Sequence, residues 1–330
     1  MFRSAFPFRV VSTLAAAILF GGFASHGPRD NTDLPDFPAS ASACAAGTIC
    51  VGPGQTYGTL ADALLAARPG SLIEIAGGTY REAVTITVGN LTIRGIGSST
   101  HIDCTGLPLA GNKACLLLAA GGITLENLDI GGAVLPEDRG ANGACIRNEP
   151  NLDFTLRRIS CHASQDGILT NGGKVVIEDS EFYDNGWTGQ THNVYFSGRC
   201  PSVIVRRSIF RDARVGHEFK SRCARTEIYD STFVSTKGSR NLDIPDGGET
   251  IVSGSTLYKM PGSESQQIIG FTPESCTYPG DMLVRNTRIV NTMIGAEIQN
   301  FDRCQGKAII FQHISFEGLP VTKRGTILGR

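Results

Sequence analysis

Short runs of alternating apolar and polar residues recur along most of the chain. In each run every second residue is apolar, and a small polar residue followed by a further apolar residue ends it before a turn. Alternation with a period of two predicts β-strands with one buried face. The runs cover residues 91–96, 123–130, 154–159, 175–182, 203–210, 226–233, 250–257, 283–289 and 309–316.

These runs recur at a regular spacing. Phe182, Phe210 and Phe233, for example, end three successive runs, 28 and then 23 residues apart. Further short strands are predicted between the runs, at 144–148, 166–170, 192–196, 216–220 and 241–245. Two or more strands per repeat of this length predict a solenoid of stacked coils, where a coil is one full turn of the chain. We therefore predict an all-β protein, a single parallel β-helix.

Two other architectures are weighed against the solenoid. A leucine-rich repeat would place Leu and Asn at fixed positions, which this chain does not do. A β-sandwich or β-propeller remains as the alternative, although the strongest sequence marks of a propeller are absent.

The first residues have the features of an export signal. Arg3 and Arg9 precede an apolar stretch over residues 10–20, and small residues follow. We predict a signal peptide over residues 1–24, with an uncleaved membrane anchor as the alternative. The stretch is short for a bilayer span, and no second candidate follows it.

The segment after the signal differs from the rest. Residues 25–43 are rich in Pro, Asp and Ser with little apolar periodicity, which predicts a flexible lead-in. Apolar residues over 60–67 have helical spacing and are followed by Pro-Gly, so we predict a short helix that caps the open end of the β-helix. The β-helix domain is assigned to residues 44–330.

The cysteines indicate an oxidising compartment. There are ten, with no C-x-x-C pair, which argues against a zinc cluster. We predict a secreted or periplasmic protein with five local disulfides, although sequence does not fix their connectivity. The expected pairs are Cys44–Cys50, Cys104–Cys115, Cys145–Cys161, Cys200–Cys223 and Cys276–Cys304.

Charge excludes some partners. The formal net charge is −1 and no Lys/Arg-rich run occurs, so nucleic acid is not an expected partner. After signal cleavage we expect no membrane association, and we expect a monomer.

Candidate chemistry concentrates in residues 191–248. Three segments, HNVYF (192–196), GHEFK (216–220) and NLDIP (241–245), follow one another there. If Val194, Phe219 and Ile244 face inward, 25 residues apart, their neighbours face outward on adjacent coils. The predicted outer patch contains Asn193, Tyr195, Glu218, Lys220, Asp243 and Pro245.

The repeat pattern over residues 50–318 resembles the right-handed parallel β-helix of the pectate-lyase-like superfamily. The opening helix and strand, residues 59–80, are similar to the N-terminal cap of many members. The superfamily includes lyases, hydrolases, epimerases, esterases and phage tailspikes, so the resemblance implies a fold more strongly than a reaction. Its members commonly bind an acidic polysaccharide along the outer strand face, which implies that class of partner here.

A narrower resemblance concerns residues 218–233, EFKSRCARTEIYDSTF. This segment is similar to the Lys-Ser segment of the alginate lyase and chondroitinase B family, polysaccharide lyase family six. The resemblance implies Asn193 and Glu218, with Asp243 tentatively added, as Ca²⁺ ligands and Lys220 as the catalytic base. In that family an Arg on the next coil acts as the general acid. The matching residues here, 244–246, include no Arg, which favours membership of a sister family.

The implied reaction is β-elimination from a uronate. A base removes the C5 proton, an acid protonates the leaving oxygen, and cationic or hydrogen-bonding groups neutralise the sugar carboxylate. Lys220 is the predicted base, with Arg222 or a bound cation favouring its neutral form, and Tyr195 is the predicted proton donor or shuttle. A solvated surface ion pair with Glu218 is the plain alternative for Lys220.

Four further residues complete the predicted site. His192 and His217 are catalytic candidates, although strict alternation would turn them inward unless they lie at a strand edge. Arg147 is predicted to bind a substrate carboxylate, and Trp187, like Tyr195, to stack on sugar rings. Asn193 and Asp243 are also candidates for substrate binding.

Alternative functions remain open. Glu218 and Asp243, at matching positions of adjacent coils, would lie about 5 Å apart, as in a retaining glycoside hydrolase. A uronate C5-epimerase would begin with the same proton abstraction as a lyase. A non-catalytic glycan-binding β-helix is the alternative from another class. We favour an exported polysaccharide lyase that acts on a uronate-containing polysaccharide.

Overall fold

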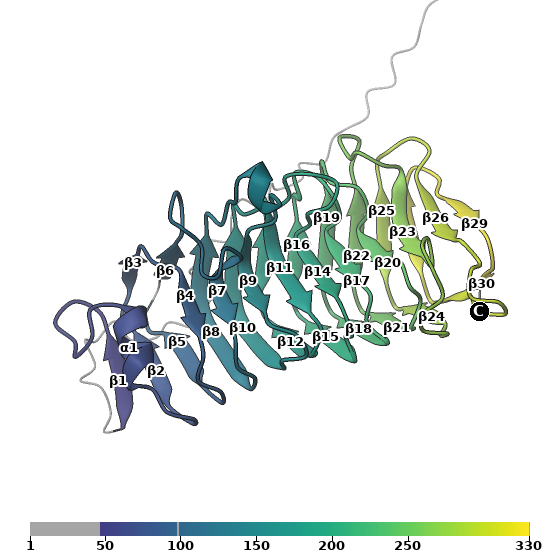
Figure 1. Cartoon of the computed structure of the whole chain (residues 1–330). Helices are drawn as coiled ribbons and strands as arrows, with labels where there is room; N and C mark the ends of the chain where they lie inside the picture. The colour runs from purple at the N-terminus through teal and green to yellow at the C-terminus, as the bar shows by residue number, and fades with distance from the viewer. Residues whose placement is uncertain (1–46, 98, 330) are drawn as a thin grey trace, which may run out of the picture. The chain divides into compact units, whose positions relative to one another are not determined.

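The computed structural model describes residues 47–97 and 99–329. This part of the chain is almost entirely parallel β-structure wound into successive coils, as Figure 1 shows. The predicted signal peptide (1–24) and lead-in (25–43) lie outside the described residues. The prediction of a parallel β-helix is confirmed.

Each coil contributes to three strand layers, which we call faces 1, 2 and 3. Face 1 contains β1 (Thr48–Val51), β2 (Leu72–Ile75), β5 (Thr92–Gly95), the first halves of β8 (Ile123–Gly131) and β10 (Phe154–His162), β12 (Lys174–Glu178), β15 (Ser202–Arg206), β18 (Arg225–Tyr229), β21 (Glu249–Ser253), β24 (Met282–Arg285), β27 (Ile309–Gln312) and β30 (Ile327–Gly329).

Face 2 continues from face 1 around a corner. It contains β3 (Gly78–Tyr80), β6 (Thr100–Asp103), the second halves of β8 and β10, β13 (Glu181–Tyr183), β16 (Ile209–Arg211), β19 (Thr232–Ser235), β22 (Thr256–Lys259), β25 (Arg288–Asn291) and β28 (Ser315–Gly318).

Face 3 is a separate sheet of ten parallel strands. It contains β4 (Val84–Ile86), β7 (Ala114–Leu118), β9 (Ala144–Asn148), β11 (Asp166–Asn171), β14 (Val194–Ser197), β17 (Phe219–Ser221), β20 (Leu242–Ile244), β23 (Gln267–Phe271), β26 (Glu297–Asn300) and β29 (Thr322–Arg324).

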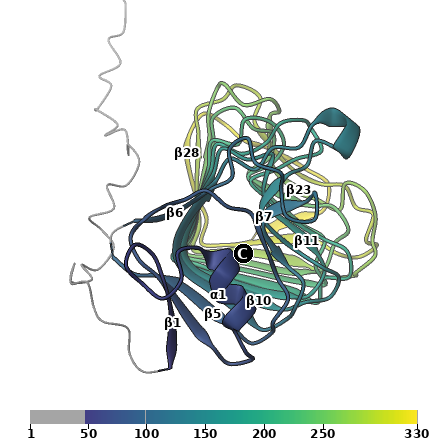
Figure 2. The ribbon, with the colours of Figure 1, turned by 60° about the vertical axis from the view of Figure 1, so that its left-hand side comes forward.

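Helix α1 (Leu60–Ala66) confirms the predicted cap. It buries Leu60 and Ala63 and lies across the opening of the first coils, as Figure 2 shows. The Thr59 side chain accepts a hydrogen bond from the backbone N–H of Asp62, and the Glu82 carboxylate accepts from the N–H groups of Leu60 and Ala61. The free N–H groups at the helix start are therefore satisfied. A short 3₁₀ turn (Glu137–Arg139) lies between β8 and β9.

In four successive sequence repeats the small polar residue is a serine that forms the corner between faces 1 and 2. Ser180, Ser208, Ser231 and Ser255 are buried there on successive coils. The backbone N–H of each of the first three donates to the hydroxyl of the next serine at 3.1 Å. The preceding residue has positive φ, for example 52° at Asp179, which turns the chain sharply. The serine ladder thus satisfies N–H groups that the turn removes from strand pairing.

Aromatic side chains stack inside the coils. The rings of Phe182, Phe210 and Phe233 are fully buried, and their centroids follow one another at 5.3 Å and 5.0 Å. Their sequence spacing had predicted equivalent positions on successive coils, and this is confirmed.

Four of the five predicted disulfides are present: Cys104–Cys115, Cys145–Cys161, Cys200–Cys223 and Cys276–Cys304. The fifth, Cys44–Cys50, includes a residue outside the described part of the chain. Within residues 47–97 and 99–329, no helix is long and apolar enough to cross a membrane.

Candidate active site

The outer side of face 3 brings together Tyr195, Lys220 and Asp243. Tyr195 pairs with Lys220 between β14 and β17, and Lys220 pairs with Asp243 between β17 and β20. The predicted match of Phe219 with Ile244 is wrong, because Phe219 pairs with Leu242. That coil is two residues shorter than the one before it, so Asp243, and not Pro245, follows Lys220 in the row.

The predicted outward positions of Asn193 and Glu218 are also wrong. Both side chains are fully buried, and Asn193 Nδ2 donates to Glu218 Oε2 at 2.6 Å and to the Arg211 carbonyl at 2.9 Å. Asn193 precedes β14, which begins at Val194, so strand alternation does not apply to it. Because Asp243 lies on the outer side, the three predicted ligands do not fit a shared Ca²⁺ ion.

The same finding removes the predicted glycosidase pair. Glu218 accepts hydrogen bonds inside the coil from Asn193 and from the Ala213 N–H, whereas Asp243 contacts Lys220 on the outer side. The two carboxylates therefore lie on opposite sides of the strand layer, with no shared sugar-binding position.

Glu218 has an unusual interior environment. Burial raises its pKa to about 8, and burial lowers the pKa of the enclosed Lys259 to about 8. The attraction between the two side chains opposes both effects. Lys259 Nζ also donates to the Ser239 carbonyl. These two groups form a polar centre inside the solenoid, away from the outer surface.

This burial predicts an unusual pH dependence of stability. Because the pKa of Glu218 is raised on folding, the native state holds its proton between about pH 4.5 and 8 while the unfolded state releases it. The contribution of Glu218 to the free energy of unfolding should therefore fall as the pH rises through this range. Glu218→Gln keeps hydrogen-bond acceptors but no titrating group, and we expect it to flatten this decline, by a few kcal/mol at most.

Urea unfolding at pH 5 and pH 8 measures this difference. Glu137→Gln on the exposed 3₁₀ turn is the matched control and should follow the wild-type protein. An equal pH dependence in the wild type and Glu218→Gln would contradict the assignment of the effect to Glu218.

A second row of side chains, just before the face 3 strands, contains the two histidines. His192 and His217 stack with ring centroids 4.8 Å apart. The N–H of His217 donates to His192 Nδ1 at 3.0 Å, and the N–H of Arg240 donates to His217 Nδ1 at 3.2 Å. Both rings therefore carry their proton on Nε2 when neutral. Both precede their strands, which is why alternation does not turn them inward.

Electrostatics keeps these imidazoles uncharged. Burial, together with neighbouring cationic side chains, lowers the pKa of His192 and of His217 well below 6.5. His217 Nε2 lies 3.3 Å from Asp243 Oδ2. His217 is thus an uncharged neighbour of Asp243, whose Oδ2 has no hydrogen-bond partner among the described residues.

Arg222 connects the predicted catalytic groups. Its Nε donates to the Tyr195 hydroxyl oxygen at 2.8 Å, and its guanidinium pairs with Asp246 at 2.8 Å and with Glu274. Lys220 Nζ lies 3.2 Å from Glu274 and 5.2 Å from the centre of the Tyr195 ring. Glu274 is half-exposed, so this ion pair is open to displacement by an anionic ligand.

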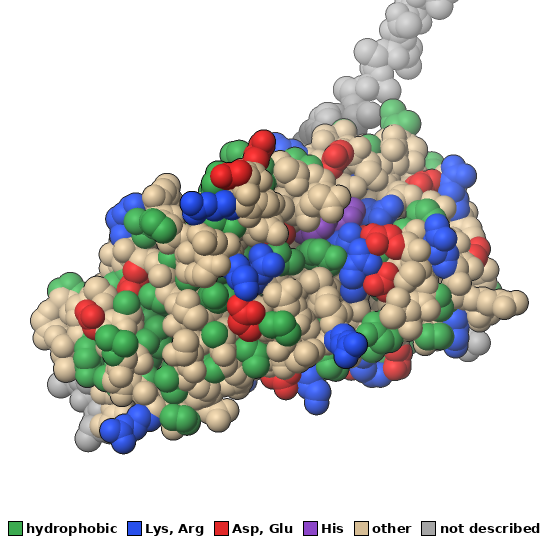
Figure 3. Space-filling model, in the orientation of Figure 1, with side chains coloured by type: hydrophobic (Ala, Val, Ile, Leu, Met, Phe, Trp, Pro, Cys, Tyr) green, Lys and Arg blue, Asp and Glu red, His purple; other side chains and the backbone are tan. Residues whose placement is uncertain are grey.

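Figure 3 shows histidine side chains beside cationic and acidic side chains on one face of the molecule. Lys220, Arg222 and Arg240 provide the positive charge of the candidate site. A binder of anionic sugars needs cationic hydrogen-bond donors of this kind.

Several residues of the site were missed by sequence reasoning. Arg240 pairs with Asp243 at 2.6 Å and donates to Gln267 at 2.6 Å. It follows His217 by 23 residues, the same interval that separates Lys220 from Asp243, so the correct coil length would have identified it. Asp246 and Glu274 lie in loops, where no periodic signal places them.

Asp166 was also missed. It begins the row that contains the two histidines, and its Oδ1 accepts the His192 N–H at 2.8 Å. Burial raises its pKa well above the ordinary value, and its Oδ2 has no hydrogen-bond partner among the described residues. The nearby charge of Arg147 partly opposes this effect.

The remaining two predicted residues are Arg147 and Trp187. Arg147 pairs with Leu169, which pairs with Tyr195, so Arg147 occupies the same row two coils earlier, as predicted. Trp187 lies in the segment before β14 and is 50% exposed. Their predicted roles in binding sugar stay predictions.

Comparison with known proteins supports the fold. The family described as "Right handed beta helix region" matches residues 73–262, and the chain therefore belongs to this family. The predicted right-handed, pectate-lyase-like fold is confirmed. No curated protein matches the sequence significantly.

Three solved structures illustrate this similarity. A pectin methylesterase from carrot is 12% identical, with a TM-score of 0.53 over 87% of this chain and 90% of that one. A pectin methylesterase mutant in complex with a hexasaccharide is 14% identical, with a TM-score of 0.53 over 87% and 94%. Pectate lyase Pel9A is 12% identical, with a TM-score of 0.52 over 80% and 72%. At these identities the similarity concerns the fold.

Proposed function

We propose that the protein is an exported polysaccharide lyase that cleaves a uronate-containing polysaccharide by β-elimination. The observation that carries the proposal is the pairing of Tyr195 with Lys220 on adjacent coils of an outer face, with Arg222 donating to the tyrosine hydroxyl. A proton-accepting amine and a proton-donating phenol on one side of a bound sugar are the two groups that this reaction requires.

The proposed steps follow from these positions. Lys220 in its neutral form removes the C5 proton of the uronate, and Tyr195 protonates the glycosidic oxygen as its bond to C4 breaks. Arg222 fixes the Tyr195 hydroxyl through its hydrogen bond of 2.8 Å. Arg240 and Arg147 supply positive charge that neutralises uronate carboxylates. One of these carboxylates belongs to the sugar that loses its C5 proton, where negative charge develops.

Asp243 has a positioning role in this proposal. Its carboxylate is fully buried and pairs with Lys220, Arg240 and His217, which together hold it in place. Asp243 thereby fixes the direction of the Lys220 side chain. The substrate carboxylate would compete with the half-exposed Glu274 for Lys220 and Arg222.

Two further observations support export and an oligosaccharide ligand. Four disulfides agree with export to an oxidising compartment. Two structures of similar fold are of pectin methylesterases in complex with hexasaccharides, which supports an oligosaccharide along the β-helix as the type of ligand.

The test is ultraviolet absorbance of the purified protein incubated with a panel of uronate polysaccharides. β-Elimination leaves an absorbing conjugated double bond, and we expect this signal to rise. We expect it to persist with a calcium-specific chelator, because Asn193, Glu218 and Asp243 do not form a joint site. New reducing ends without absorbance, or methanol release from methyl-esterified pectin, would replace the lyase by a hydrolase or an esterase. A change in uronate configuration without cleavage would indicate an epimerase.

A further inference from the structure

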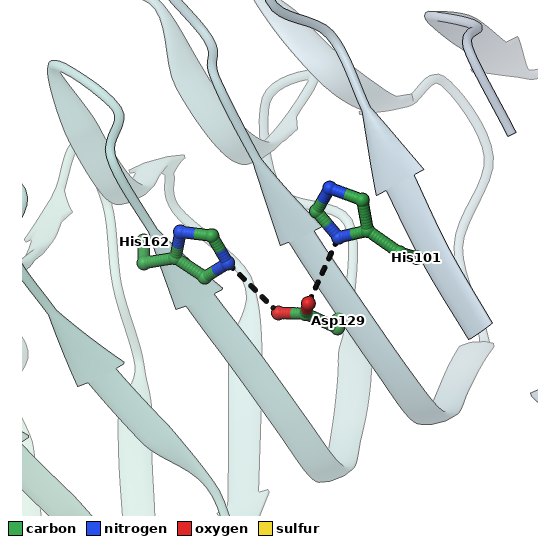
Figure 4. Close-up of side chains that lie close together, drawn as sticks. All are labelled: His101, Asp129 and His162. Carbon is green, nitrogen blue, oxygen red and sulfur yellow. Dashed lines mark ion pairs between the residues drawn. The ribbon is translucent and has the colours of Figure 1, made fainter. Parts of the chain in front are cut away.

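A second cluster of functional groups lies on face 2, separate from the proposed lyase site. His101 on β6, Asp129 on the second half of β8 and His162 at the end of β10 come from three successive coils. Figure 4 shows the Asp129 carboxylate between the two imidazoles, with each ring presenting a nitrogen to it. We propose that these three side chains bind a divalent transition-metal ion of the zinc class.

The distances suit one ion. His101 Nδ1 lies 2.8 Å from Asp129 Oδ2, His162 Nε2 lies 3.0 Å from Asp129 Oδ1, and one ligand atom from each residue falls within a span of 4.8 Å. Ligand atoms around tetrahedral zinc are about 3.3 Å apart, as bonds of about 2.0–2.1 Å require. Small side-chain rotations would therefore bring all three atoms onto one ion.

Two ligand atoms lack ordinary partners. His101 Nδ1 and Asp129 Oδ1 are buried atoms without a hydrogen-bond partner among the described residues, despite the short distances across the cluster. A buried polar atom without a hydrogen bond is costly. A bound cation would satisfy both atoms at once. Two poorly directed contacts between N–H groups and the carboxylate do not.

The surrounding residues hold the ligands in position. Gly131 pairs with His162, and a Cβ at Gly131 would lie 3.0 Å from the His162 ring, so a larger residue there would crowd the ring beside Asp129. On its other side the His162 ring stacks on Tyr183 at 5.0 Å, and the Arg211 guanidinium covers the Tyr183 ring at 4.2 Å. The arrangement limits ring movement, as a metal site requires.

The ligand types select the class of ion. Two imidazoles and one carboxylate suit Zn²⁺, Co²⁺, Ni²⁺ or Fe²⁺, whereas Ca²⁺ and Mg²⁺ prefer a shell of oxygen ligands. The three side chains are only partly buried, so further coordination positions open to water or to an external ligand.

The experiment is calorimetric titration of the chelator-treated, full-length protein with Zn²⁺, alongside Co²⁺ titration followed by visible absorbance. We expect one equivalent of Zn²⁺ to bind. His162→Ala, Asp129→Asn and His101→Ala should each weaken binding by about 100-fold or more, since loss of an outer-shell partner alone costs about 10- to 100-fold, while Mg²⁺ should not bind there. Anomalous diffraction at the zinc edge should place the ion between the three residues.

His313→Ala is the matched control, because His313 lies at a corner near the end of the chain and outside the cluster. It should bind Zn²⁺ as the wild type does. Absence of Zn²⁺ binding, or binding that survives in all three cluster variants, would overturn the proposal. Because binding is measured without substrate, failure here is distinguishable from failure of the proposed lyase activity.

Discussion

Lys220→Ala should reduce the rate of β-elimination by about 100- to 10,000-fold, the usual contribution of a positioned general base. The reason is that Lys220 is the only amine in the described row that contains Tyr195 and Asp243. The fold should persist, because Asp243 keeps its ion pair with Arg240 at 2.6 Å and its contact with His217. The initial rate of absorbance increase on the best substrate measures the loss.

Three variants sharpen this test. Lys220→Arg keeps the positive charge and should be nearly as inactive, because a guanidinium does not release its proton. Tyr195→Phe removes the hydroxyl that Arg222 contacts and should also lose most activity. Lys237→Ala, at an exposed position, is the matched control and should leave the rate unchanged. A fully active Lys220→Ala protein with wild-type circular dichroism would exclude Lys220 as the base.

Phe210→Ala should lower the free energy of unfolding by about 3–5 kcal/mol, the usual cost of deleting a buried aromatic side chain. Phe210 stacks between Phe182 and Phe233, and it also meets Phe219 edge to face at 5.4 Å. Its removal would leave a cavity bordered by three coils. Urea unfolding followed by circular dichroism gives the loss.

The control for this prediction is Phe316→Ala. Phe316 lies on β28, the last described strand of face 2, and is 40% exposed, so its removal should cost far less. Because each coil contacts only its neighbours, hydrogen exchange should increase mainly around residues 182–233 in Phe210→Ala. Equal stability losses in both variants would contradict the assigned importance of the phenylalanine stack.

The sequence predicts the repeat well, because every coil must bury apolar residues at alternating positions. The serine at four successive corners is also visible in the sequence, although its ladder of hydrogen bonds is not. Phe182, Phe210 and Phe233 were placed on equivalent positions by spacing alone, and they stack. The capping helix was visible through its apolar spacing and the Pro-Gly that follows it.

The candidate site was less predictable, because it depends on register at the strand edges. Asn193 and Glu218 lie just before strands, where the backbone is not extended, and both turn inward. The sequence interpretation made one coil two residues too long. It therefore placed Pro245 beside Lys220, where the structure has Asp243. Tyr195 and Lys220 lie within strands, and their predicted pairing is confirmed. Residues of long loops, such as Glu274, carry no periodic signal at all.

The serine corner has a consequence for how the surface could diversify. Because one residue and a serine join faces 1 and 2 on four successive coils, that edge offers no room for added chain there. Length differences fall instead on the two borders of face 3: residues 132–143 enter it before β9, but only 163–165 before β11. The corner between faces 1 and 2 is thus constant in length, whereas the connections at the borders of face 3 vary. Insertions that change ligand specificity can therefore accumulate beside the candidate site while the stacking of the coils stays intact.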